Sequence, residues 1–519
     1  MPRLSIDNRE VEVPEGATIL DAAGKLGIDI PTMCFMKGYL PSTSCMVCVV
    51  KVEGRAVLLP ACGTLAEEGM RVESDCEEVH QARKAALELL LSDHVGDCLG
   101  PCHMICPALM NIPLMIRQIA AGKLRDAIET VKKDIALPAV LGRICPKPCE
   151  RGCRRAAIDE AVSICLLKRY VADADLESAK PYSPACKPEQ DKRVAIIGAG
   201  PAGLAAAYYL QQAGFGCTVF DDHEQPGGML RYGVSEEDLP RDVLDKEIAQ
   251  IEKLGFTFKG KTRIDDSASL EKLHKDFDAV FIAFGAMDAG DAESMGLKTS
   301  AKGVAIDGKT YQTNMPGVFA GGDAVRKRRL TVRSVADGKE AAECISQYLS
   351  GGKVTGPDKP FNTRIGKIQD GEKERFAECA SNNPRVTVSH KGEGFTDEQA
   401  RREAARCLHC DCRKADSCKL RQYARDYGAR PNRYKSERRL FVQQAQHPKL
   451  IYEPGKCIDC GLCVQIATKA GEELGLTFIG RGFDVRVAVP FERSIADGLK
   501  QSAAECVAAC PTGALAFTE

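Results

Sequence analysis

The sequence predicts a multidomain protein that combines α/β and α+β domains in one chain. Its 519 residues are too many for one hydrophobic core and, at about 100–200 residues per domain, indicate about three to five domains. Its 25 cysteines are bunched at close spacings, and its middle third alternates strand-like with helix-like segments. These observations divide the chain into segments 1–78, 79–185, 186–355, 356–440 and 441–519.

The bulk composition argues against several classes of protein. With 44% hydrophobic and 28% charged residues and a formal net charge of -1, nothing favours nucleic acid or a membrane surface as a partner. The first residues lack the apolar stretch of a secretory signal, and no apolar run of about 18 residues predicts a membrane span. We therefore expect a cytoplasmic protein, in which CxxC and CxxxC spacings favour metal or cluster ligation over disulfides.

Segment 1–78 has the pattern of a small β-rich domain. LSIDNREVEV predicts a hairpin with its turn at Asp7-Asn8, and VCVVKVEGRAVLLPA predicts two further strands. TILDAAGKLG predicts a short amphipathic helix that ends at Gly27. Four cysteines follow with the spacing Cys34-x10-Cys45-x2-Cys48-x13-Cys62. Four thiolates are what a [2Fe–2S] cluster requires, and a zinc site is the alternative.

A resemblance to a known family supports the cluster. PTMCFMKGYLPSTSCMVCVVKVEG, followed by LLPACGT and GMRV, resembles the N-terminal ferredoxin domain of the large iron–sulfur subunit of NADH:quinone oxidoreductase (complex I). The same domain occurs in related hydrogenases and formate dehydrogenases. The resemblance covers residues 1 to about 98, and it implies a β-grasp ferredoxin that binds one [2Fe–2S] cluster.

Segment 79–185 is predicted to be helical. VHQARKAALELLLSDH and NIPLMIRQIAAGKLRDAIETVKKD place apolar residues at three- and four-residue steps. Candidate ligands recur every four residues in two groups, and eight of them suit two [4Fe–4S] clusters. They are His94, Cys98, Cys102 and Cys106, then Cys145, Cys149 and Cys153, and finally Cys165.

CHMICP and GRICPKPCERGC…AVSICLLKRY resemble the N-terminal domain of the glutamate synthase small subunit and of dihydropyrimidine dehydrogenase. That resemblance implies two interleaved sets, Cys98, Cys102 and Cys153 for one cluster and Cys106, Cys145 and Cys149 for the other. The fourth ligands depart from the family pattern. The first position falls near His94, which is a ligand or a surface histidine. The second aligns with Lys168, which cannot ligate while protonated, so Cys165 is our substitute.

Segment 186–355 carries a dinucleotide-binding fingerprint. Gly198-x-Gly200-x-x-Gly203, which includes Pro201 and Ala202, follows the strand RVAII and opens a helix, and Asp221 ends the next strand. The glycines allow the pyrophosphate to approach the helix N-terminus, and the acid would accept hydrogen bonds from the ribose. We therefore predict a Rossmann-like domain.

Two further stretches favour FAD over NAD(P). PGGMLRYGV, with Gly227, Gly228 and Arg231, resembles the flavin-binding stretch of the glutamate synthase small subunit. MPGVFAGGDA resembles the second flavin motif of that superfamily, in which Gly322 and Asp323 would contact the ribityl chain. In that family an NAD(P)H domain is inserted between the two flavin halves. Here only DAGDAESMGLKTSAK lies between them, whereas a βαβ unit needs about 30 residues, so we expect no nicotinamide site on this chain.

The last cysteines form two groups. CLHCDCRKADSC, in segment 356–440, predicts a [4Fe–4S] site, a zinc site or no metal at Cys407, Cys410, Cys412 and Cys418. In segment 441–519, three close cysteines and a distant one before a proline predict one [4Fe–4S] cluster in a ferredoxin-like domain. These ligands are Cys457, Cys460, Cys463 and Cys510, with Cys506 as a spare or alternative. FIGRGFDVRVAVPF and CVAACPTGAL resemble the ferredoxin region of the same complex I subunit.

The predicted inventory is one FAD, one [2Fe–2S] cluster and three to four [4Fe–4S] clusters, with no catalytic residue assigned. The resemblances imply an oxidoreductase subunit that passes electrons between redox protein subunits. They imply an NADH-oxidising FMN subunit as one redox partner and a hydrogenase, formate dehydrogenase or other reductase as the second. Electron bifurcation at the flavin is a hypothesis. The alternatives are a self-sufficient NAD(P)H-dependent reductase and a non-catalytic zinc and cluster scaffold.

Overall fold

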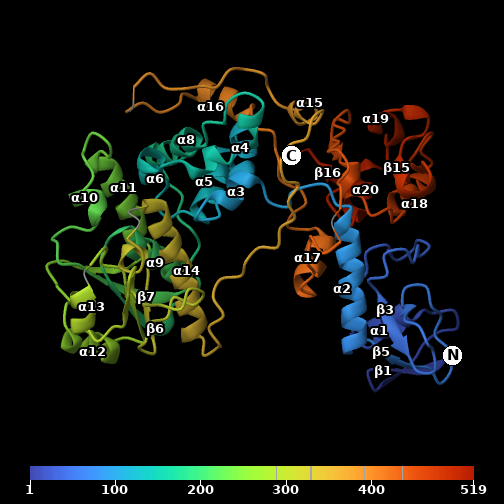
Figure 1. Cartoon of the computed structure of the whole chain (residues 1–519), viewed down its shortest axis with the longest axis horizontal. Coiled ribbons are helices and arrows are strands. Elements are labelled where there is room, and N and C mark those ends of the chain that lie inside the picture. Colours follow the sequence, from blue (N-terminus) through green and yellow to red (C-terminus); the bar gives the residue numbers. More distant parts are fainter. Residues whose placement is uncertain (288, 328–329, 391, 435, 519) are drawn as a thin grey trace. The chain divides into compact units, whose positions relative to one another are not determined.

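The computed structural model describes residues 1–287, 289–327, 330–390, 392–434 and 436–518. They form two compact units, each assembled from separate stretches of the chain (Figure 1). The terminal unit comprises Met1–Gly100, Pro360–Cys379 and His409–Glu519, and the central unit comprises Pro101–Lys359 and Ala380–Leu408. Within the described residues, no helix combines the length and the apolar character that crossing a membrane would need.

The terminal unit begins with a five-stranded sheet in the order β2-β1-β5-β3-β4. The predicted hairpin is confirmed, because β1 and β2 pair antiparallel and Asp7 and Asn8 adopt the left-handed conformation at the turn (φ 48° and 63°). β5 runs parallel to β1, and helix α1 begins with a capping box at Thr18. The elements are β1 (Arg3–Ile6), β2 (Arg9–Glu12), α1 (Ile19–Lys25), β3 (Val49–Val52), β4 (Leu59–Pro60) and β5 (Arg71–Glu73).

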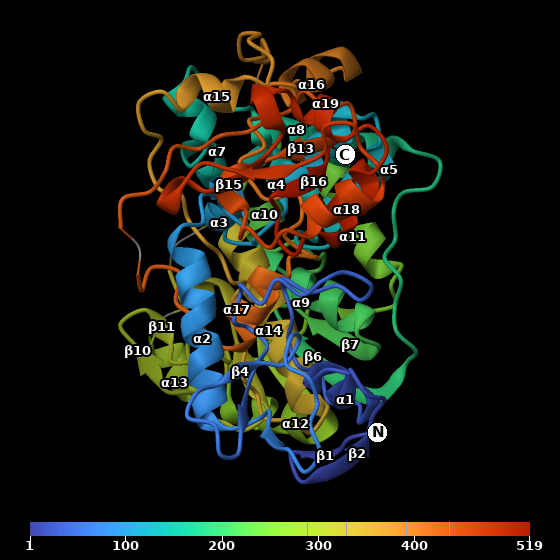
Figure 2. The ribbon, with the colours of Figure 1, turned by 90° about the vertical axis from the view of Figure 1, so that its right-hand side faces the viewer.

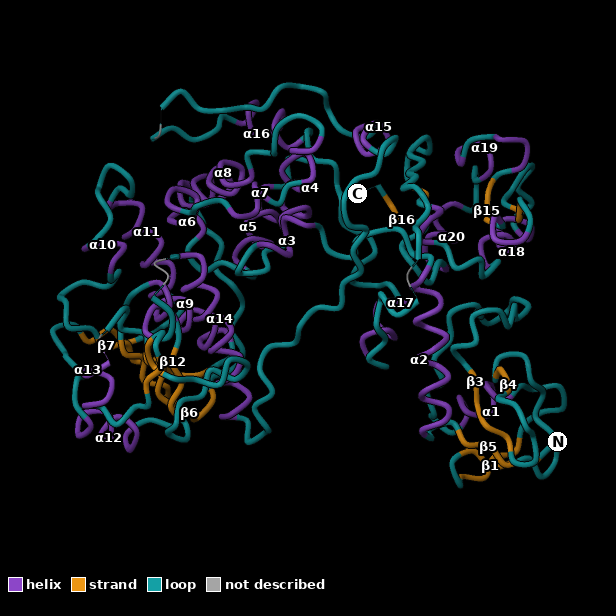
Figure 3. The backbone as a smooth tube through the Cα atoms, viewed as in Figure 1, coloured by secondary structure: helices purple, strands orange, loops and turns teal. Residues whose placement is uncertain are grey.

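Helix α2 (Glu77–Ser92) is one long helix in the terminal unit (Figures 1 and 3), and α17 (Lys419–Asp426) packs against it. Leu87 and Leu91 are buried in the apolar cluster that these helices share. Arg83, also buried, donates to the carbonyl of Val49 and to the hydroxyl of Tyr427. The sheet, α2 and the stretch His409–Glu519 are therefore parts of one structural unit.

The C-terminal part of the terminal unit is a small α+β element. Its outer strands β13 and β16 pair antiparallel, and helices α18 and α20 pack together over them around a core that includes Ile466 and Cys506. The elements are α15 (Lys373–Ala377), β13 (Leu450–Tyr452), α18 (Leu462–Lys469), β14 (Thr477–Ile479), β15 (Arg486–Ala488), α19 (Ile495–Gly498), α20 (Ala503–Ala509) and β16 (Leu515–Phe517).

The central unit contains a five-stranded parallel sheet in the order β12-β9-β6-β7-β8 (Figure 3). Helices α9 and α14 pack on each other beside it, and a Cβ on Gly338 would lie 2.2 Å from the carbonyl oxygen of Ala202. Such a doubly wound sheet confirms the predicted Rossmann-like fold. The elements are β6 (Gln190–Ile197), α9 (Pro201–Gln212), β7 (Phe215–Phe220), α10 (Met229–Tyr232), α11 (Arg241–Glu252), β8 (Thr257–Lys259), α12 (Ser267–Asp276), β9 (Ala279–Ile282), α13 (Ala289–Ser294), β10 (Thr299–Ser300), β11 (Gly303–Val304), β12 (Val318–Ala320) and α14 (Thr331–Leu349).

A group of short helices precedes this sheet in the central unit, as the periodicity predicts (Figure 2). Helix α16, from the stretch that returns to the unit after the sheet, packs on α4 and α8. Buried Glu403 of α16 accepts hydrogen bonds from the backbone of Ser163 and Val386 and pairs with buried Arg406 at 2.9 Å. The helices are α3 (Pro101–Ile105), α4 (Ile112–Ala120), α5 (Leu124–Lys132), α6 (Pro138–Ile144), α7 (Pro148–Arg151), α8 (Ile164–Glu177) and α16 (Asp397–Ala404).

Candidate cofactor sites

The glycine-rich loop between β6 and α9 forms the floor of a dinucleotide cradle. Gly198 has a φ of 105°, and a Cβ on Gly203 would lie 1.9 Å from the carbonyl oxygen of Gly198, so only glycine fits there. Gly200 is the N-cap of α9 and has open space where its Cβ would be, with Pro201 and Ala202 in the first turn. The loop therefore leaves the helix N-terminus accessible to a phosphate group.

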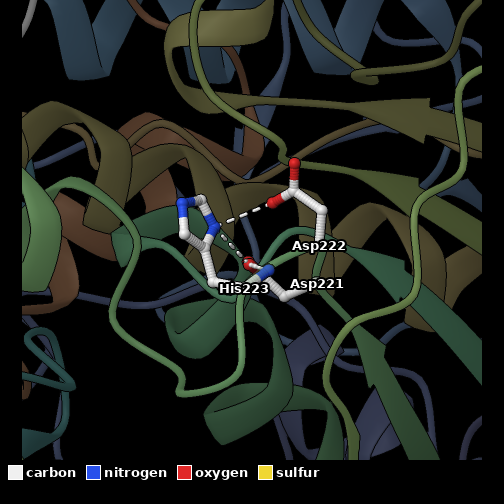
Figure 4. A group of neighbouring side chains, drawn as sticks. All are labelled: Asp221, Asp222 and His223. Atoms are coloured by element: carbon white, nitrogen blue, oxygen red, sulfur yellow. Dashed lines mark hydrogen bonds and ion pairs between the residues drawn. The ribbon is translucent and has the colours of Figure 1, made fainter.

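Asp221 accepts a hydrogen bond from the backbone of the glycine-rich loop, and Figure 4 shows it beside Asp222 and His223. Its carboxylate accepts from the amide of Ala199 at 2.6 Å and from the amide and Nδ1 of His223 at 2.9 Å each. Ligand atoms of Asp221, Asp222 and His223 lie within 4.8 Å of one another, but the last two side chains are largely exposed. This carboxylate thus stands beside the glycine loop, where the fingerprint predicts the ribose contact.

The second predicted nucleotide-binding stretch, with Gly227 and Gly228, contacts the same loop. The amide of Gly227 donates to the carbonyl of Ala199, and a Cβ on Gly228 would lie 2.8 Å from the Cα of Gly200. Arg231 donates to the carbonyl of Pro226 and pairs with Asp245, so it orders this loop. The structure therefore brings the first two predicted nucleotide-binding stretches together.

The third stretch closes the cradle from β12. Gly322 (φ 69°) approaches so closely that a Cβ there would lie 2.9 Å from the Cβ of Ala202, and Asp323 follows it. The amide of Gly322 donates to buried Asp337, which also pairs with Arg326 and Arg333. Burial raises the pKa of Asp337, although the two arginines oppose the shift. Sequence reasoning did not single out this acid or its arginines; Asp337 and Arg333 lie in α14, which follows the second predicted flavin motif.

The four N-terminal thiols converge in the terminal unit. Cys34, Cys45, Cys48 and Cys62 are all buried, and the Sγ atoms of Cys48 and Cys62 are 3.4 Å apart. Hydrogen bonds from Cys45 and Cys62 lower the pKa of Cys34 to about 2, and one from Cys62 lowers the pKa of Cys48 to about 7. Thr43 and Met46 adopt left-handed conformations in the loop, which turns the thiols toward one another. This donor set fits a [2Fe–2S] cluster.

A second set converges in the central unit around a lysine. A hydrogen bond from Cys165 lowers the pKa of Cys145 to about 6, and burial raises the pKa of Cys149 to about 12. Burial alone would lower the pKa of Lys168, but the thiols, led by Cys165, raise it. The amide of Cys165 donates to Glu150, which Arg385 holds at 2.7 Å. Cys106 also lies within electrostatic reach of Lys168, so the structure places Cys106, Cys145, Cys149 and Cys165 around one buried cation.

The C-terminal set lines one cavity in the terminal unit. Cys457, Cys460, Cys463 and Cys510 border it together with Tyr452 and Val487, and the cavity is almost entirely apolar otherwise. Four thiols around an enclosed space fit a cubane cluster. Cys506 is fully buried in α20, where its thiol donates to the carbonyl of Cys463 at 3.7 Å.

The remaining candidates divide between the units. His94, Cys98, Cys410, Cys412 and Cys418 belong to the terminal unit, and Cys102, Cys153 and Cys407 belong to the central unit. The amide of Cys412 donates to the carbonyl of Cys98 at 3.2 Å. In the central unit Arg155 donates to the carbonyl of Arg406 at 3.1 Å, which brings the chain near Cys153 toward that near Cys407. The ligand sets expected for these residues remain predictions.

Comparison with protein families defines the class of protein that this fold and these thiols represent. Residues 2–77 match the 2Fe-2S iron-sulfur cluster binding domain, and residues 73–180 match dihydropyrimidine dehydrogenase domain II, 4Fe-4S cluster. Residues 196–252 match the NAD(P)-binding Rossmann-like domain. The chain is therefore a multidomain iron–sulfur protein with a Rossmann-like nucleotide-binding domain.

Similar proteins are named subunits of oxidoreductases. The NADPH-Fe(3+) oxidoreductase subunit beta of Geobacter sulfurreducens is 40% identical over 208 residues, which are 39% of this chain and 30% of that protein. The NADP(+)-dependent formate dehydrogenase subunit beta of Moorella thermoacetica is 37% identical over 328 residues, 56% of this chain and 45% of that protein. The glutamate synthase [NADPH] small chain of Bacillus subtilis is 32% identical over 248 residues, 47% of this chain and 50% of that protein.

The matches confirm the resemblance to the glutamate synthase small subunit and to dihydropyrimidine dehydrogenase. The chain spans at most half the length of each of these three relatives.

Proposed function

We propose that this protein is an iron–sulfur flavoprotein that transfers electrons as a subunit of a larger oxidoreductase. The observation that carries the proposal is that one unit contains both the dinucleotide cradle and the thiols of Cys106, Cys145 and Cys149. Bound FAD would exchange electrons in pairs, and clusters would carry them singly. The chain's own residues supply the cradle, the burial and the thiolates.

FAD is the dinucleotide that the cradle favours. The β12 stretch with Gly322 lies against the first turn of α9, and Gly338 lets α14 approach the same helix. Between β9 and β12 the described residues form only α13 and the β10–β11 hairpin. That segment is too short for a second nucleotide-binding domain, which supports electron supply by a partner.

The partners that we propose are redox subunits. Two of the relatives carry the name of a beta subunit, which supports assembly with at least one other chain. An NADH-oxidising FMN subunit would deliver or receive electrons at one side. A hydrogenase, a formate dehydrogenase or another reductase would do so at the other. Bifurcation at the flavin is the most specific form of this proposal.

A self-sufficient NAD(P)H-dependent reductase is the second candidate. It is favoured by the names of the similar proteins, which include NADPH and NADP(+). The two candidates differ in what the isolated chain does with nicotinamide. In the first, reduction requires a partner, and in the second it does not.

An anaerobic titration tests the choice. The purified chain is mixed with NADH or NADPH, and the flavin and cluster absorbance is followed, with dithionite as a control for reducible cofactors. We expect dithionite to bleach the absorbance and the nicotinamides to leave it unchanged. Rapid bleaching by either nicotinamide would establish the second candidate, and absence of bound flavin in a cluster-loaded protein would contradict both.

A further inference from the structure

Three cysteines from distant parts of the sequence meet inside the terminal unit. Cys98 follows α2, whereas Cys412 and Cys418 precede α17, and each side chain is 7% exposed. The amide of Cys412 donates to the carbonyl of Cys98 at 3.2 Å. A gathering of buried thiols with no disulfide is the usual environment of a thiolate-bound metal centre.

The sulfur atoms of this group interact electrostatically. Burial, together with the charges of Cys412 and Cys98, raises the pKa of Cys418 to about 12. Burial likewise raises the pKa of Cys412, which also interacts with Cys98. The three sulfurs therefore lie within electrostatic reach of one another inside the unit.

Polar groups already contact these sulfurs. The amide of Arg421 donates to the Sγ of Cys418 at 3.5 Å. The hydroxyl of Thr363 donates to the carbonyl of Gly96 at 2.8 Å and accepts from the thiol of Cys98 at 3.3 Å. Two buried guanidinium nitrogens of Arg413 have no hydrogen-bond partner among the described residues. Amide donors to ligand sulfurs, such as that of Arg421, are among the contacts that tune iron–sulfur centres.

A glycine and a buried lysine lie close to Cys412. A Cβ on Gly513 would lie 2.2 Å from the Sγ of Cys412, so this position needs glycine. Lys456 is buried, pairs with Glu453 at 2.6 Å, and interacts electrostatically with Cys412. A buried cation near Cys412 offsets part of the negative charge that ligation would create.

We propose that Cys98, Cys412 and Cys418 supply three of the iron ligands of a separate iron–sulfur cluster in the terminal unit. This assignment differs from the two groupings that the sequence suggests. The first joins Cys98 to Cys102 and Cys153, and the second joins Cys412 and Cys418 to Cys407 and Cys410. It rests on the proposed iron–sulfur chemistry and is independent of the flavin and of any partner subunit.

The proposed cluster stands at the end of a series within the terminal unit. The amide of Lys419, next to Cys418, donates at 2.9 Å to the carbonyl of Pro511, next to Cys510 of the C-terminal set. The carbonyl of Cys460, also in the C-terminal set, accepts at 2.6 Å from the hydroxyl of Ser42, which lies between Cys34 and Cys45 of the N-terminal set. Three thiol sets thus follow one another inside this unit, which suits electron passage along it.

The test compares alanine variants of the full chain, purified anaerobically. Cys98→Ala, Cys412→Ala and Cys418→Ala should each lose the same cluster signal in electron paramagnetic resonance and about four iron atoms per chain. Cys76→Ala, a half-buried cysteine outside every set, is the matched control and should lose none. Retention of the [2Fe–2S] signal shows that each variant has folded.

Two outcomes would overturn the assignment. One is that Cys98→Ala and Cys102→Ala remove the same signal while Cys412→Ala and Cys418→Ala leave it intact. The other is that Cys412→Ala and Cys418→Ala bind as much iron as the unchanged protein. Either result leaves the proposed function standing, whereas an unchanged protein that binds no iron at all contradicts that function itself.

Discussion

The N-terminal thiol set and the central thiol set gather four sulfurs in different ways. In the first, Cys34, Cys45, Cys48 and Cys62 hydrogen-bond among themselves within residues 34–62, a stretch that includes β3 and β4. Their pKa values are therefore split, with those of Cys34 and Cys48 lowered and those of Cys45 and Cys62 raised. In the second, the thiols come from several helices and face the buried ammonium of Lys168. The first site is formed by one continuous stretch of the chain. The second depends on a framework of segments that are distant in the sequence and on the fixed charge of Lys168.

The largest effect should come from removing one thiol of each set. Cys62→Ala should eliminate the [2Fe–2S] signal and about two iron atoms, and Cys149→Ala should eliminate one [4Fe–4S] signal and about four iron atoms. Iron analysis and electron paramagnetic resonance give both readouts. Cys217→Ala, a buried cysteine of β7 outside either set, should change neither. If Cys149→Ala also removed the [2Fe–2S] signal, the two sites would not be independent.

The framework of the central set should be sensitive to a change far from its thiols. Glu403→Gln removes one of the two charge partners of fully buried Arg406, the other being Asp159 at 3.0 Å, and weakens two backbone contacts, one to Ser163 at the start of α8. The midpoint of denaturant unfolding should fall, by less than the about 3–5 kcal/mol that a buried charge left without any partner would cost.

The exposed residue Glu398 lies on the same helix, and Glu398→Gln should be neutral. The [2Fe–2S] signal should survive in Glu403→Gln while the central cluster is depleted. Equal loss of the [2Fe–2S] signal and of the central cluster would contradict the distinction between a site formed by one continuous stretch and a site formed by distant segments.

A pH dependence should distinguish the central framework as well. Glu247 accepts from the amides of Ala139 and Val140 at the start of α6, and burial raises its pKa from 4.5 to about 7. The folded state then binds more protons than the unfolded state between these values. Its stabilising contribution is present below about pH 4.5 and is lost as the pH rises through about 7, by about 3 kcal/mol.

Thermal unfolding of the unchanged protein and of Glu247→Gln between pH 5 and pH 8 measures this contribution. The stability of the unchanged protein relative to the variant should fall as the pH rises. A constant difference over this range would show that Glu247 is ionised throughout.

The smallest effect should be a shift in potential at the central cluster. Lys168→Met removes a buried positive charge that favours the more negative, reduced state. With an effective dielectric constant of about 20 and a separation of about 8 Å, the change is about 2 kcal/mol, or roughly 100 mV toward lower potential.

A redox titration followed by electron paramagnetic resonance gives the midpoint. Lys168→Arg should keep most of the midpoint potential of the unchanged protein. Lys192→Met, which removes an exposed lysine of β6, should leave the midpoint potential unchanged. If the midpoint potential of the central cluster were unaltered in Lys168→Met, the charge of Lys168 would not contribute to the difference between the two sites.

Local patterns in the sequence predicted most of the fold. The hairpin at Asp7-Asn8, helix α2 and the strand–loop–helix at Gly198 follow from turn chemistry, periodicity and glycine spacing. The N-terminal thiols could be predicted because their ligands are close in the sequence and need no outside charge.

The remaining features depend on contacts between distant residues. Ser163 and Glu403 are 240 positions apart, and no local pattern links Cys98 to Cys412. Lys168 was recognised as unable to ligate, but its position among four thiols follows only from the packing of several helices. Propensity and spacing carry no information about such contacts, because tertiary packing alone creates them.

The partner of helix α2 arrives late in synthesis. Arg83 bonds the hydroxyl of Tyr427, a residue 344 positions further along the chain. At about 5–20 residues per second, the ribosome takes roughly 20–70 s to deliver it. During that interval the apolar face with Leu87 and Leu91 lacks the helix that covers it. A chaperone, or separation from other nascent chains, therefore matters most to this protein during the interval before Tyr427 is synthesised.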